Sequence, residues 1–81
     1  MNDLQLITFR DLLNDTRFCK KNTQIILNHR QNESESWSKI CGNCLDDHIL
    51  RFMDCNLLAV KYEIGEPLMV AVEGKPHEWG V

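Results

Sequence analysis

This sequence has no cluster of basic residues. Its nine lysines and arginines are scattered, the longest run is Lys20-Lys21, and the net charge is −3. A protein that binds nucleic acid mainly through phosphate contacts needs a basic patch or stripe. The sequence therefore predicts that nucleic acid is not the main partner.

Long apolar runs are also absent. None approaches the roughly 18 residues that a membrane-spanning helix needs. The first residues, Met-Asn-Asp-Leu, lack the positive charge and the apolar segment of a signal peptide. We therefore expect no membrane contact and a location in the cytoplasm. Thiols stay reduced there, so the four cysteines are not expected to form two disulfides.

Motifs that indicate catalysis are missing as well. The three histidines lie far apart, and none accompanies a serine or cysteine in a known nucleophile motif. No glycine-rich phosphate loop occurs. Asp46 and Asp47 are adjacent, but adjacent side chains on a helix point about 100° apart, so a role in the first helical turn is favoured over acid–base chemistry. We predict that the protein is not an enzyme and needs no cofactor.

What is present is a regular succession of short elements. Eighty-one residues are enough for one hydrophobic core. Thr8 and Asp11 have the spacing of a capping box at the start of a short helix. A second helix is predicted over 45–53, with Leu45, Ile49 and Phe52 as its apolar stripe. Strands are predicted over 23–29, 37–41, 57–64 and 68–73.

This order, helix, hairpin, helix, hairpin, predicts an α+β fold. Four strands in a largely antiparallel sheet, with the two short helices packed on one face, are the economical arrangement. We expect a single domain over residues 1–74. Residues 75–81, which include Trp79, carry no pattern and are predicted to form a C-terminal tail.

The stretch Cys-Gly-Asn-Cys-Leu-Asp-Asp-His, residues 41–48, has the spacing of a metal knuckle. A structural zinc site normally pairs two such knuckles, and this sequence contains only one. The simpler interpretation is a strand-to-helix corner, in which Gly42 allows the turn and Asn43 caps the helix by accepting from the amide near Asp46. We predict no metal. The alternative is a zinc site, with ligands Cys41, Cys44, His48 and Cys55.

The last two strands predict an interaction surface. Alternation places one set of residues inward: Leu58, Val60, Tyr62, Ile64, Leu68, Val70 and Val72. The outward positions then include four apolar residues: Leu57, Ala59, Met69 and Ala71. Lys61, Glu63 and Glu73 form the edge of this patch, and an apolar centre with a charged rim is typical of interfaces. We predict that this face binds a second copy of the chain or another protein.

Several short motifs resemble one group of proteins. These are Thr8-Phe-Arg-Asp-Leu-Leu13, the strand Gln24-Ile-Ile-Leu27, Gly42 before the second helix and the terminal hairpin from Val60 to Val72. Over about residues 4–73 the chain resembles small, mostly uncharacterised proteins borne by bacteriophages and prophages of Gram-positive bacteria. The resemblance implies no activity and no site residues. It implies a setting in the host cytoplasm, where small acidic proteins often bind and block host machinery, including defence systems.

The sequence thus predicts a non-enzymatic binding protein that self-associates or binds a host protein. Two alternatives remain open. One is a small zinc-stabilised module that uses the knuckle of Cys41 and Cys44. The other is an oligomer that sequesters a small ligand in a pocket at a subunit interface.

Overall fold

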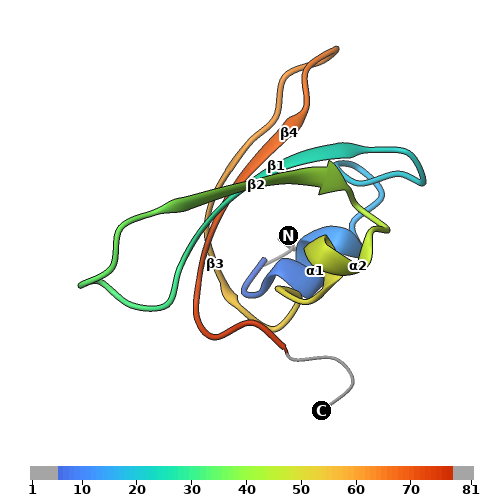
Figure 1. The fold of residues 1–81 in the computed structure, drawn as a ribbon. Coiled ribbons are helices and arrows are strands. Elements are labelled where there is room, and N and C mark those ends of the chain that lie inside the picture. Colours follow the sequence, from blue (N-terminus) through green and yellow to red (C-terminus); the bar gives the residue numbers. More distant parts are fainter. Residues whose placement is uncertain (1–5, 78–81) are drawn as a thin grey trace.

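The computed structural model describes residues 6–77, which form a four-stranded sheet with two short helices on one of its faces (Figure 1). In chain order the elements are α1 (Phe9–Leu13), β1 (Gln24–Arg30), β2 (Ser38–Asn43), α2 (Asp47–Leu50), β3 (Asn56–Lys61) and β4 (Leu68–Glu73). The predicted α+β class and the order helix, hairpin, helix, hairpin are confirmed.

The sheet has the strand order β2-β1-β4-β3. Each hairpin, β1 with β2 and β3 with β4, pairs in the antiparallel sense. The two hairpins join through a parallel pairing of β1 with β4 at the centre of the sheet. The sheet is therefore mixed, with antiparallel pairing in two of its three contacts.

The core lies between the sheet and the helices. On the two central strands, alternate residues point to the same face and are buried there, such as Ile25 and Leu27 on β1 and Val70 on β4. Phe9 and Leu12 from α1 pack onto this face, as do residues from the α2 region. The buried residues of this cluster are Phe9, Leu12, Cys19, Ile25, Leu27, Cys44, Ile49, Phe52, Cys55, Leu68, Val70 and Val72.

The predicted capping box at the start of α1 is confirmed. Thr8 Oγ1 accepts from the amide of Asp11, and Asp11 Oδ2 accepts from the amide of Thr8 at 2.9 Å. The Asp11 carboxylate accepts hydrogen bonds from the backbone N–H groups of Thr8 and Ile7, and these bonds lower the pKa of the carboxyl. The next helical amides, those of Phe9 and Arg10, donate to carbonyls at positions 55 and 53. A helix of only five residues is thus stabilised by bonds to a distant segment.

The start of α2 differs from the prediction. The helix begins at Asp47 rather than at position 45, and Asn43 belongs to the end of β2. Asn43 Oδ1 accepts from the amide of Leu45, and Asp46 Oδ2 accepts from the amide of Asn43, both at 2.9 Å. These two bonds form a tight turn over 43–46 that delays the helix. The predicted cap from Asn43 to the amide near Asp46 is wrong, and Leu45 is 58% exposed rather than part of the buried stripe.

A β-bulge changes the faces of β3. Leu57 is opposite Val72 and Ala59 is opposite Ala71, so Leu58 is an extra residue on this strand. Leu57 consequently packs against the core, and Leu58 is 49% exposed. The predictions that Leu57 points outward and Leu58 inward are wrong, whereas Val60 does pack against the core.

The β3–β4 turn extends beyond the helices (Figure 1). β3 ends at Lys61, so the predicted alternation does not reach the next residues. Tyr62 is half-exposed and makes an edge contact with the Phe18 ring, with centroids 5.6 Å apart. Ile64 is 91% exposed, so its predicted inward position is wrong.

The first residues of the predicted C-terminal tail contact the domain. The thiol of Cys55 donates to the carbonyl of Lys75 at 3.7 Å, and the amide of His77 donates to the carbonyl of Arg51 at 2.6 Å. Trp79 and the rest of the predicted tail lie outside the described residues. Across residues 6–77 no helix is both long enough and apolar enough to cross a membrane.

Candidate functional site

The residues of the zinc alternative do not come together. Cys41 is exposed, whereas Cys44 is buried and its thiol donates to the carbonyl of Lys20 at 3.0 Å. Cys55 is buried against residue 75, and the His48 ring contacts backbone. Among residues 6–77 no three His, Cys, Asp or Glu side chains are grouped so that they could hold a metal ion. The spacing of the knuckle therefore does not produce a four-ligand geometry.

The glycine of the knuckle makes room for the histidine. A Cβ atom at Gly42 would lie 2.5 Å from Nε2 of His48 and 3.0 Å from Cγ1 of Ile49. That Nε2 atom lies 2.9 Å from the carbonyl oxygen of Cys41 and donates to it, because a carbonyl can only accept. His48 therefore holds α2 against β2, an edge strand of the sheet.

Gly42→Ala is expected to lower the free energy of unfolding by about 1–3 kcal/mol, because the added methyl displaces the His48 ring and overpacks the corner. In a His48→Ala background the same change should cost less, with a coupling of roughly 0.5–3 kcal/mol. Urea denaturation of the four variants of this cycle measures the coupling. Strictly additive costs would show that Gly42 and His48 do not share this space.

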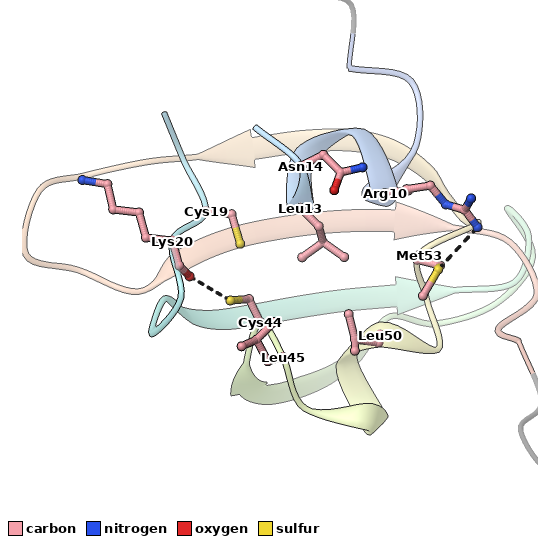
Figure 2. Close-up of a pocket in the computed structure, with 9 residues that line it drawn as sticks. All are labelled: Arg10, Leu13, Asn14, Cys19, Lys20, Cys44, Leu45, Leu50 and Met53. Atoms are coloured by element: carbon pink, nitrogen blue, oxygen red, sulfur yellow. Dashed lines mark hydrogen bonds between the residues drawn. The ribbon is translucent and has the colours of Figure 1, made fainter. Parts of the chain in front are cut away.

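A pocket of about 420 Å³ lies on the helical side of the sheet (Figure 2). Its walls are mostly apolar and come from α1, the segment after it, the corner at Cys44 and the α2 region. Leu13, Cys19, Cys44, Leu50 and Met53 form these walls. Arg10 also borders the pocket, but its guanidinium is paired with Asp54 at 2.7 Å. The size suits a small apolar molecule, and the pocket lies within one chain rather than at a predicted subunit interface.

Two cysteine thiols border this pocket, those of Cys19 and Cys44. Figure 2 shows the sulfur of Cys19 directed towards Cys44. Burial, together with the neighbouring Cys44 thiol, raises the pKa of Cys19 to about 12. Burial and the nearby Asp54 carboxylate also raise the pKa of Cys55. Since reactive cysteines need a lowered pKa, the thiols of Cys19 and Cys55 stay protonated and unreactive at neutral pH.

A thiol-specific reagent such as Ellman's reagent is therefore expected to modify one thiol per folded, monomeric chain quickly, that of the exposed Cys41. The three buried thiols should react only as the protein unfolds, because burial blocks access to them, and at Cys19 and Cys55 it also disfavours the thiolate. The Cys41→Ser variant should lose the fast phase entirely. Fast modification of a second thiol in folded protein would contradict the burial of Cys19 and Cys44.

The opposite face of the sheet is the second candidate site, and we call it the outer face. Both helices pack on the core side, and no described helix covers the outer face. Ile26 of β1 and Met69 of β4 are neighbours at its centre, and Met69 is 38% exposed. Ala71 and Ala59 form the next pair towards β3. The residues that the register places on the outer face are Gln24, Ile26, Asn28, Arg30, Lys39, Cys41, Asn43, Asn56, Ala59, Lys61, Met69, Ala71 and Glu73.

The outer face has an ordered ion pair beside its apolar centre. Nε of Arg30 lies 2.9 Å from Oε2 of Glu73, and both side chains are about three-quarters buried. The guanidinium also lies over the ring of Trp37, 4.4 Å from its centroid. Arginine, tryptophan and methionine are enriched where proteins bind one another. This composition favours a protein-binding surface.

The structure brings together three of the four predicted interface residues: Ala59, Met69 and Ala71 lie around a shallow depression of about 200 Å³. Leu57 is excluded by the bulge. Sequence reasoning missed Ile26, because β1 and β4 are far apart in the chain and their parallel pairing has no local signal. Arg30 was missed for the same reason, since it meets Glu73 through this pairing, and Trp37 was missed with it because it stacks on Arg30.

Comparison of the chain with protein-family models, with curated proteins and with solved structures finds no match.

Proposed function

We propose that this chain is a non-enzymatic binding protein that works as a homodimer, with the outer face as the dimer surface. The observation that carries the proposal is the uncovered apolar centre, Ile26, Met69, Ala59 and Ala71, on a sheet whose other face holds both helices. A sheet face exposed to water alone is normally polar. Pairing removes these side chains from water.

The charges on the outer face favour a second copy as the occupant. Arg30 and Glu73 sit together, and Lys61 lies 3.9 Å from Glu63, so both signs are present around the apolar centre. A surface that pairs with itself needs both signs, because a two-fold axis presents the same patch to both partners. A domain of this size also buries a smaller share of its surface on folding than a larger domain does, so it gains from pairing.

The resemblance to phage and prophage proteins implies a setting in the host cytoplasm. We propose that the dimer acts there by binding and blocking a host protein.

Met69→Lys tests the proposal. A charge at the centre of the dimer surface should shift the protein from dimer to monomer in sedimentation velocity, with the circular dichroism spectrum unchanged. Leu45→Lys is the matched control, because it makes the same change at an exposed leucine on the helical side and should leave the dimer intact. A wild-type chain that stays monomeric at high concentration overturns the proposal, and so does a Met69→Lys variant that remains dimeric.

A further inference from the structure

The outer face of the central strands has three rows. In the parallel pairing of β1 with β4, Ile26 is beside Met69, Asn28 is beside Ala71 and Arg30 is beside Glu73. The rows run from apolar at one end of the strands to an ion pair at the other end. β1 and β4 run in the same direction at the centre of the sheet, with one hairpin partner strand on each side.

We propose that two copies pair through their outer faces about a two-fold axis. The axis lies between the two faces, parallel to the strands, and passes over the line midway between β1 and β4. This inference rests on the proposed function and adds the arrangement of the dimer. The rotation keeps the direction of the strands and exchanges β1 with β4. Each row of one copy then meets the same row of the other copy in reverse order, so that Ile26 faces Met69 and Arg30 faces Glu73 across the interface.

The other simple face-to-face arrangement fails on charge. An axis perpendicular to the strands reverses their direction, and β1 then lies over β1 of the other copy. Arg30 would face Ile26, and Glu73 would face Met69, so each charge would be buried against an apolar side chain. The ion pair within each chain would then lose its contact with water and gain no opposite charge across the interface, which disfavours this pairing.

The ion pair within each chain has capacity for a second partner. A guanidinium offers five N–H donors and a carboxylate offers two oxygens, and the contact of Arg30 with Glu73 within the chain engages one nitrogen and one oxygen. Stacking on Trp37 holds the guanidinium in place, 4.4 Å from the ring centroid. Two such pairs around the axis form a closed network of four alternating charges.

Single charge reversals test this arrangement. Arg30→Glu gives a chain with two carboxylates at this site, and Glu73→Arg gives a chain with two guanidinium groups. Each variant alone should be mainly monomeric in sedimentation velocity, because like charges face each other across the axis. An equal mixture of the two variants should recover the dimer, since every contact across the axis then joins opposite charges. The repulsion within each chain remains in the mixture, so recovery reports the contact between chains alone.

The double reversal R30E/E73R keeps the ion pair within the chain and removes any concern about folding of the single variants. It should form a homodimer but should not exchange subunits with the wild type, because a mixed dimer would place Arg30 opposite an arginine and Glu73 opposite a glutamate. Native mass spectrometry with one chain labelled with nitrogen-15 measures the mixed dimer. We expect the mixed species to be nearly absent.

A mixed dimer that makes up about half of the population, as random exchange gives, overturns this arrangement. Single variants that dimerise like the wild type do the same. In both cases a dimer that Met69→Lys disrupts leaves the proposed function standing. A wild-type chain that is monomeric throughout overturns both.

Discussion

Leu27→Ala is expected to lower the free energy of unfolding by about 2–5 kcal/mol. Leu27 has no exposed surface, and it sits on β1 between Ile40 of β2 and Val70 of β4. Removing its side chain leaves a cavity at the centre of the only core that the described residues form, and close-packed neighbours on three strands cannot collapse into it fully. Urea denaturation measures the loss.

Leu58→Ala is the matched control for Leu27→Ala. Leu58 is the same residue type in the same sheet, but the bulge leaves it 49% exposed. Its truncation should cost roughly 0.5 kcal/mol or less, as at most surface positions. Both variants are compared with the wild type at one protein concentration, because the stability of a dimer depends on concentration. Equal losses in the two variants would contradict the bulge.

Ile49→Ala is expected to cost a similar amount, about 2–5 kcal/mol. Ile49 is fully buried on α2, a helix of four residues that depends on this contact because its length gives it little intrinsic stability. Its side chain lies over the corner at Gly42 and joins α2 to the core beneath β1 and β4. Thermal unfolding followed by circular dichroism measures the effect.

Leu45→Ala distinguishes the observed start of α2 from the predicted one. If residues 45–53 formed one helix with Leu45 in its apolar stripe, the loss for Leu45→Ala would approach that for Ile49→Ala. Because the Asn43–Asp46 turn leaves Leu45 58% exposed, the expected loss is roughly 0.5 kcal/mol or less. A large loss would restore the longer helix.

Local patterns predicted most elements of this fold. The Thr8–Asp11 capping box marks its helix start, and β4 has the predicted bounds, because alternating apolar residues between a turn and a glycine need no distant information. The errors arise where a side chain competes with the backbone pattern. Asn43 and Asp46 have high capping propensity, but their side chains accept from the amides of Leu45 and Asn43 in the turn rather than from amides of the helix.

The candidate site depends on contacts that no local pattern contains. The bulge at Leu58 is an adjustment of β3 to its partner strand, and it moves Leu57 from the predicted interface to the core. Ile26 and Arg30 meet Met69 and Glu73 on the outer face only because β1 lies beside β4. The pattern of the last hairpin therefore predicted the part of the outer face that β3 and β4 form. It could not predict the part that β1 forms.

Native mass spectrometry of the wild-type chain tests the central claim most directly, because it reports subunit number and any bound metal in one spectrum. The outer face predicts a dimer at twice the chain mass of 9.5 kDa, with no added mass. Met69→Lys should give the monomer under the same conditions. A wild-type spectrum that contains only a 9.5 kDa monomer, or that monomer with one zinc ion, would contradict the account.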